Sequence, residues 1–153
     1  GVFGDALDKK GGTSIEYVRQ FLKGKFPAAP KWGVLISDVR DVAKSHVACI
    51  GNKKVGGRRL IVGKEVKKLI ELSQIMSDAL PEYAKKLPKK ELPNFMVKLI
   101  SYFDSSAKTM IPDLEIVMQP QSSYAEELLG MKFKSAKGAI TDAARSVVKL
   151  GLV

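Results

Sequence analysis

Hydrophobic positions recur every three or four residues over most of this chain, which is the spacing of one face of an α-helix. The clearest example is a helix predicted near the C-terminus, with Ile140, Ala143, Ala144 and Val147 on one face. The same spacing predicts a long amphipathic helix over residues 66–80. The other predicted helices cover residues 13–23, 42–50, 94–107 and 123–129. The stripe predicted to be buried on the helix over 94–107 consists of Phe95, Leu99, Ile100 and Phe103.

Short apolar segments interrupt this helical pattern and predict strands. They are the tail of a strand at residues 2–3, a strand at 32–36, a β-rich segment at 59–62 and a last strand at 114–118. Widely separated strands of this length do not make a self-sufficient sheet. We therefore expect them to join a sheet that other residues build, and the chain to be part of something larger.

Residues that begin and end helices are also visible in the chain. Asp38 or Asp41 is well placed to cap the helix over residues 42–50, because its side chain can accept a hydrogen bond from a free backbone N–H of the first turn. The short helix over 123–129 has Ser122 or Ser123 at its start and Gly130 as a left-handed stop at its end.

Length and composition are those of one globular domain with a single hydrophobic core. The chain has 153 residues, of which 45% are hydrophobic and 27% are charged. No apolar run is long enough to cross a membrane, and no signal peptide is visible at the start. The one cysteine, Cys49, cannot form an internal disulfide and has no metal-ligand spacing with other residues. We therefore expect a protein of a reducing compartment, the cytoplasm, with no metal site.

A formal net charge of +10, from 26 Lys and Arg against 16 Asp and Glu, means that a nucleic-acid function has to be weighed. The lysines are spread along the chain in pairs, and no aromatic residues lie among them as a base-stacking surface requires. There is no zinc-finger spacing and no single long basic helix. We interpret most lysines as solvated residues on outer helix faces, and keep a basic nucleic-acid-binding domain as an alternative.

The chain offers no set of residues for catalysis on its own. A nucleophilic triad needs a histidine base, and the only histidine, His46, lies within an apolar helical pattern that predicts a partly buried structural residue. Ser, Thr and Asp residues stand at capping positions, where local hydrogen bonds explain them. Residues 1–7 contain two glycines of a dinucleotide fingerprint, but Leu7 stands where the third glycine belongs.

Residues 38–47 read Asp-Val-Arg-Asp-Val-Ala-Lys-Ser-His-Val. This segment resembles the Asp-Val-Arg-Asp-Val-Ala-x-x-His sequence of extended short-chain dehydrogenase/reductases, most closely in the branch of dihydroflavonol reductases. Other segments resemble the same family in the same order: Val-Phe-Gly at 2–4, Gly-Arg-Arg-Leu-Ile-Val at 57–62, Ala-Glu-Glu-Leu-Leu-Gly at 125–130 and Leu-Gly-Leu-Val at 150–153. The resemblance covers essentially the whole chain. Asp5 and Met131 depart from it, since the family has Pro and usually Trp at these places.

The resemblance implies an α/β fold, the C-terminal portion of an extended Rossmann-type reductase, mainly helical, with a few short strands that complete a parallel sheet. It implies a single substrate-binding region over 1–153, with the N-terminal cofactor-binding Rossmann half absent from this chain. The family reduces carbonyls with a tyrosine and a lysine four residues later. The residues four positions after the tyrosines are Phe21, Leu87, Ser106 and Leu128. We therefore expect no catalytic residue here, and no activity of this chain alone.

For the site, the resemblance implies a cleft that closes over a small-molecule carbonyl substrate, an aldehyde or ketone. Phe3 and Gly4 would lie against the cofactor, NADP or NAD, which the missing N-terminal half would mainly bind. Asp5 and Leu7 would line the substrate side, with Trp32 as a second wall. For Phe3 and Trp32, ordinary core packing is an equal alternative.

Other interpretations remain open beside these. We favour a structural role over substrate contact for Asp38, Arg40 and Asp41. In that role they cap the helix that follows the strand and hold it in place. The whole chain can also be interpreted as a stand-alone pseudo-enzyme, a binding or assembly protein whose strand edges and apolar faces are covered by self-association. Formation of a homo-oligomer is compatible with both interpretations of the chain.

Overall fold

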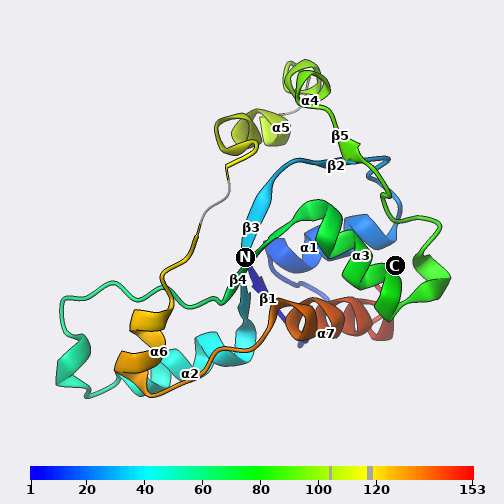
Figure 1. Cartoon of the computed structure of the whole chain (residues 1–153). Coiled ribbons are helices and arrows are strands. Elements are labelled where there is room, and N and C mark those ends of the chain that lie inside the picture. The colour runs from blue at the N-terminus through cyan, green and yellow to red at the C-terminus, as the bar shows by residue number, and fades with distance from the viewer. Residues whose placement is uncertain (104, 117–118) are drawn as a thin grey trace.

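A computed structural model describes residues 1–103, 105–116 and 119–153 (Figure 1). Its helices are α1 (Thr13–Leu22), α2 (Val39–Cys49), α3 (Leu69–Ala79), α4 (Asn94–Ile100), α5 (Ser105–Met110), α6 (Ser123–Leu129) and α7 (Ala136–Lys149). Its strands are β1 (Val2–Phe3), β2 (Ala29–Pro30), β3 (Gly33–Asp38), β4 (Glu65–Lys68) and β5 (Glu91–Leu92). Short 3-10 helices are η1 (Lys53–Val55), η2 (Pro81–Tyr83) and η3 (Ile111–Asp113). The prediction of a mainly helical α/β chain with a few short strands is confirmed.

Three strands form one mixed sheet in the order β1–β3–β4. β1 runs parallel to β3, with Val2 opposite Ser37 and Phe3 opposite Asp38, whereas β4 runs antiparallel to β3. β2 and β5 form a separate parallel pair of two residues each. The expected parallel pairing therefore applies to β1 with β3, and β4 adds an antiparallel strand at the other edge.

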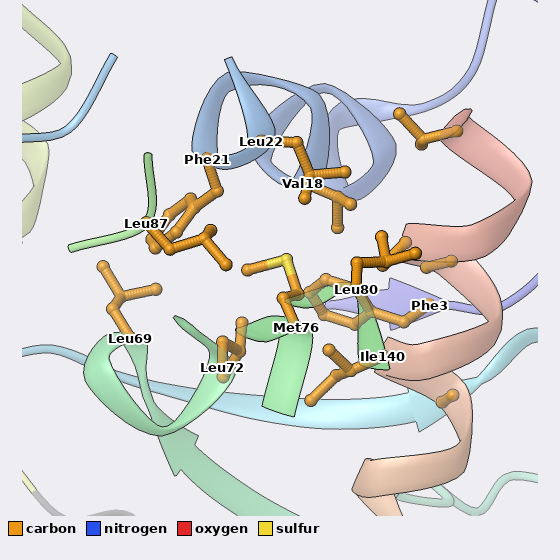
Figure 2. Close-up of a cluster of buried hydrophobic side chains, with 14 of the residues drawn as sticks. Phe3, Val18, Phe21, Leu22, Leu69, Leu72, Met76, Leu80, Leu87 and Ile140 are labelled. Atoms are coloured by element: carbon orange, nitrogen blue, oxygen red, sulfur yellow. The ribbon is translucent and has the colours of Figure 1, made fainter. Parts of the chain in front are cut away.

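The hydrophobic core lies where α1, α3 and α7 pack on one another and on the sheet. Figure 2 shows side chains from all three helices converging, and Leu22 of α1, Met76 of α3 and Ile140 of α7 belong with Phe3 of β1 to one buried cluster. Leu22 and Ile140 are completely buried, and so are the alanines and the valine predicted for the inner face of the last helix. Because alanine is small, α7 can approach the sheet closely along this face.

Asp38 ends β3 and caps α2. Its Oδ1 accepts a hydrogen bond from the Arg40 backbone N–H at 2.8 Å, so the prediction of a capping aspartate is confirmed. The Arg40 guanidinium donates to both carboxylate oxygens of Asp38 and, at 2.7 Å, to Asp142 of α7. Asp41 accepts a hydrogen bond from the Lys134 backbone N–H at 2.6 Å. These contacts fix the end of β3 and the start of α2 to α7 and to the segment before it.

The ionised form of Asp38 is favoured in the folded chain. Burial raises the pKa of Asp38, but the hydrogen bonds from the Arg40 side chain and backbone outweigh burial and hold the pKa below its ordinary value of 3.8. On acidification the unfolded chain therefore takes up this proton before the folded chain does. The carboxylate stabilises the fold at neutral pH, and its contribution is lost as the pH falls below about 4.

We expect Asp38→Ala to lower the free energy of unfolding by about 2–3 kcal/mol at pH 7, because it removes the cap and leaves Arg40 with one carboxylate. Asp38→Asn keeps a capping oxygen and loses only the charge, so we expect it to lower the free energy of unfolding by about 1 kcal/mol. Urea unfolding at pH 7 and pH 3 measures both. The difference in free energy of unfolding between the wild-type chain and Asp38→Asn should be smaller at pH 3 than at pH 7. An unchanged difference would mean that the charge of Asp38 contributes nothing to stability.

The outward face of α2 differs from the predicted one. Asp41 and Ser45 are buried, whereas Val47 and Ile50 are 70% and 80% exposed. His46 is exposed as well, so the prediction of a partly buried histidine is wrong. The polar face of α2 turns inward because the Asp41 carboxylate is satisfied there by a backbone N–H from the segment before α7. That partner is 93 positions away, and the local pattern does not reveal it.

The second half of the sheet lies further along the chain than predicted. Residues 59–62 are not a strand, and β4 begins at Glu65 instead. α3 therefore starts at Leu69 and not at residue 66. Antiparallel pairing with β3 places Val66 opposite Leu35, and this long-range pairing outweighs the helical spacing that Val66 shares with Leu69.

The helix predicted over residues 94–107 is divided into α4 and α5, and its predicted buried stripe is exposed. Phe95, Leu99, Ile100 and Phe103 are 70%, 59%, 40% and 90% exposed. Val97 is the buried residue of α4. The prediction fails because a hydrophobic stripe is buried only where another element covers it. α4 and α5 lie away from α3 and α7 (Figure 1), whereas Val97 and Ile100 of α4 line a pocket together with Tyr17 of α1.

Two further predictions concern the second half of the chain. Gly130 has a φ of 63° directly after α6, so the left-handed stop is confirmed. The strand predicted over 114–118 is not seen at 114–116, and Val117 and Met118 lie outside the described residues. No helix within the described ranges is long and apolar enough to cross a membrane.

Candidate functional site

An apolar cavity of about 400 Å³ lies between β1, α1, β3 and α3. Tyr17 and Phe21 reach it from one face of α1, since residues four apart share a helix face. Leu72 and Met76 reach it in the same way from α3. In the described part of the chain, no charged side chain lines this cavity, and its polar side chains are few. Such a space suits a small apolar molecule that carries one or two polar atoms.

Phe3 forms one wall of the cavity, and Gly4 follows directly at the end of β1. The Phe3 side chain is 4% exposed and also belongs to the core, so cavity lining and core packing coincide at this residue (Figure 2). Gly4 has a φ of 141°, and a Cβ there would lie 2.6 Å from Cγ1 of Val39. Glycine is therefore needed at this position because β1 ends very close to the start of α2.

Trp32 forms another wall, next to β3. Its backbone is held on both sides, since its N–H donates to Pro30 O at 2.8 Å and its carbonyl accepts from Leu69 N at 3.1 Å. The indole Nε1 is buried and finds no acceptor among the described residues. A buried N–H without an acceptor lowers stability unless a water molecule or a ligand accepts from it. Trp32 thus lines the cavity and keeps one unused hydrogen-bond donor buried.

Asp5 and Leu7 lie outside this cavity. Both side chains are exposed, Leu7 by 96%. The backbone N–H of Ala6 between them donates to Ser146 Oγ at 2.9 Å, which holds this loop against α7. The structure therefore brings Phe3 and Trp32 to one cavity and leaves the two other residues predicted for the substrate side in solvent.

Sequence reasoning did not single out Tyr17, Leu69, Leu72 or Met76 as site residues. Their helical spacing signals burial, and burial in a core and burial around a cavity give the same pattern. The contact that decides the difference is the hydrogen bond from the Leu69 backbone N–H to Trp32, which brings the start of α3 to the cavity.

The cavity can bind and orient a molecule, but the described side chains that line it include no acid–base pair. Tyr17 is the only ionisable side chain among its described lining residues, and Phe21 stands one helical turn after it, where a supporting lysine would have to be. Over the same described ranges, His, Cys, Asp and Glu do not gather in groups of three or more that could hold a metal ion.

Comparison with known proteins gives matches among solved structures alone. No protein-family model matches the sequence, and a search of curated proteins finds no relative. Yeast methylglyoxal/isovaleraldehyde reductase Gre2, complexed with NADPH, matches with a TM-score of 0.66 and 23% identity over 98% of this chain and 45% of its own. Candida albicans Gre2 in complex with NADPH matches with a TM-score of 0.68 and 22% identity, over 97% of this chain and 41% of its own. The protein gox2253 matches with a TM-score of 0.76 and 21% identity, over 99% of this chain and 48% of its own.

These matches share one feature, which is their unequal coverage. Nearly the whole of this chain matches, but it spans less than half the length of each of the three solved structures. The fold is therefore that of one part of these solved structures, and the predicted fold class, a mainly helical α/β portion of a Rossmann-type fold, is confirmed.

Proposed function

We propose that this chain is the C-terminal, substrate-binding part of an NAD(P)H-dependent carbonyl reductase of the extended short-chain type, similar to dihydroflavonol reductases and working in the cytoplasm. The match of nearly the whole chain to less than half of three solved structures, one of them named as a reductase, supports this proposal. The observation that carries a binding role is the apolar cavity, which Trp32 helps to line. Its occupant would be an aldehyde or ketone with an apolar body.

In this proposal the dinucleotide is held mainly by an N-terminal Rossmann half of the same protein. Two Gre2 structures contain NADPH, which favours NADP over NAD. Phe3 and Gly4 fit a place beside the nicotinamide only through their main chain, because the Phe3 side chain is in the core and Gly4 has none. The cofactor, when bound, supplies the hydride. The catalytic tyrosine and lysine would also come from the N-terminal half.

The residues of this chain would bind and enclose the substrate. Trp32 would pack against the substrate and so help to fix its orientation, and the apolar wall from Phe3 to Met76 would keep water away from the carbonyl. Asp5 and Leu7, in solvent here, would meet the N-terminal half and close the open side of the site.

The test uses the chain's one tryptophan, because Trp32 fluorescence reports directly on the cavity. We expect acetophenone and 2-heptanone to change this emission with saturation, and Val34→Phe to weaken that binding at least about tenfold by filling the cavity. Val47→Phe makes the same change on the exposed face of α2 and should leave binding unaltered. When the chain alone is mixed with NADPH and the same ketones, we expect no oxidation of NADPH. Saturable binding that Val34→Phe leaves intact, or NADPH oxidation above the blank, would contradict the proposal.

A stand-alone assembly protein is the second candidate function. It is favoured by the exposed side chains of Phe95, Leu99 and Phe103, and by the position of β1 at the edge of the sheet. It differs from the first in one measurable respect. A stand-alone assembly protein should self-associate with rising concentration in sedimentation velocity and should not bind ketones at Trp32.

A further inference from the structure

One surface of the molecule is strongly basic and serves neither the core nor the cavity. Between Asp41 and Glu65 the chain has no acidic residue. This stretch has six exposed cations, and five of them, which we call the basic arm, are Lys44, Lys53, Lys54, Arg58 and Arg59. In the part of the chain that the structure describes, none of the five lies within 4.0 Å of a carboxylate oxygen as an ion pair. Their charges are therefore available to an outside partner.

The backbone holds most of these cations on a projecting loop. Gly51, with a φ of 71°, ends the turn after α2, and Asn52 Oδ1 accepts a hydrogen bond from the Lys54 backbone N–H to start η1. Gly57, with a φ of 68°, makes the next turn. Figure 1 shows this segment running out beyond the end of α2, beside α6 and away from α1, α3 and α7. Like charges so placed repel one another, so a polyanion that lies along them is attracted by all of them.

The fold adds an aromatic side chain that the local sequence lacks. Tyr124 of α6 is 66 positions from Arg58, yet its hydroxyl accepts a hydrogen bond from Arg58 Nη1. The Arg58 guanidinium carbon lies 6.0 Å from the centre of the Tyr124 ring, which is 41% exposed. An exposed ring beside a guanidinium is a surface on which a nucleobase can stack. α6 also carries acidic side chains, and one of them, Glu126, accepts a hydrogen bond from the Phe133 backbone N–H.

We propose that the basic arm and Tyr124 bind single-stranded nucleic acid, with backbone phosphates on the lysines and arginines and a base stacked on Tyr124. The sequence argues against nucleic-acid binding because no aromatic residue lies among the basic ones, and the contact of Tyr124 with Arg58 removes that objection. The proposal is independent of the carbonyl-binding cavity, which lies among other elements. An anionic membrane would use the charges but would gain nothing specific from a stacking ring.

The first experiment measures binding of fluorescein-labelled 20-nucleotide oligo(U) and oligo(dT) to the 153-residue chain by fluorescence anisotropy. We expect a Kd in the micromolar range at low salt. If the five cations each contact a phosphate, the slope of log K against log salt is about −3.5, and affinity falls roughly 100-fold between 50 and 200 mM salt. Absence of binding at 50 mM salt to both oligonucleotides would overturn the proposal.

Three variants separate this surface from general positive charge. We expect Lys53→Glu with Lys54→Glu to weaken binding more than about tenfold, and the matched pair Lys89→Glu with Lys90→Glu to change it less than about twofold. Tyr124→Ala should weaken binding about tenfold through lost stacking, whereas Tyr124→Phe should retain it. Thermal melting of each variant checks that the fold is intact.

The other outcomes all count against the proposal. Equal weakening by the two lysine pairs would mean that net charge alone attracts the oligonucleotide. Binding that Tyr124→Ala leaves unchanged would mean a polyanion site without base stacking. Binding to phosphatidylserine–phosphatidylcholine vesicles in place of oligonucleotides would assign the basic arm to a membrane surface.

Discussion

Replacing Leu22 by alanine is expected to lower the free energy of unfolding by about 3–4 kcal/mol, among the largest effects of any single change in this chain. Leu22 is completely buried on α1, within the cluster that α1, α3 and α7 form with β1. The smaller side chain loses its burial and leaves a space that neighbouring helices fill only in part. For a domain of this size the midpoint of thermal unfolding should fall by about 10 °C.

Leu7→Ala is the matched control for this prediction. It is the same chemical change at a side chain that is 96% exposed, so we expect the free energy of unfolding to stay within about 0.5 kcal/mol of the wild-type value. Urea unfolding of both variants measures the difference. Similar losses in the two variants would mean that the α1–α3–α7 cluster is not the core of the folded chain in solution.

Gly4→Ala is expected to cost about 3 kcal/mol, for two separable reasons. A residue with a side chain rarely adopts a φ of 141°, and its Cβ would lie 2.6 Å from Cγ1 of Val39. The valine cannot easily move aside, because it is β-branched and stands in the first turn of α2, next to the Asp38 cap. Gly138→Ala is the opposite case, since nothing crowds that exposed helical position and alanine favours helix, so we expect a gain of about 0.5–1 kcal/mol.

A double-mutant cycle with Val39→Ala separates the two causes. Removing the valine methyl groups relieves the contact and leaves the unfavourable φ, so Gly4→Ala should cost less in the Val39→Ala background than in the wild-type chain. Chemical denaturation of the four proteins gives the coupling free energy. A coupling of zero would mean that β1 and α2 do not approach as closely as the structure shows, and the alignment of Phe3 with the cavity would then also be in doubt.

Several parts of the fold could be predicted from the sequence because the interactions that produce them are local. The inner face of α7 follows from spacing alone, since Ile140, Ala143 and Val147 are within two turns of one another. Asp38 caps α2 by a hydrogen bond to a residue two positions away, and Gly130 ends α6 by its own backbone conformation. The same kind of local information carried the resemblance to reductases, whose fold the structural matches confirm.

Other parts depended on residues far apart in the chain. The segment 65–68 became a strand because β3 lies beside it, and the polar face of α2 is buried because of a backbone N–H near α7. The apolar stripe of α4 looks like a core face but stays exposed, since periodicity identifies a hydrophobic surface without identifying what covers it.

The candidate sites follow the same division. The residue types were visible in the chain: an aromatic near the strand at residue 32, lysine pairs, and no tyrosine with a lysine four residues later. Only the tertiary structure decided that Phe3, Trp32 and Met76 surround one cavity, and that Tyr124 meets Arg58. The physical reason is that spacing along the chain determines which face of a helix or strand is apolar. Which faces meet depends on packing among all of them, and a cavity or a charged surface is a property of that packing.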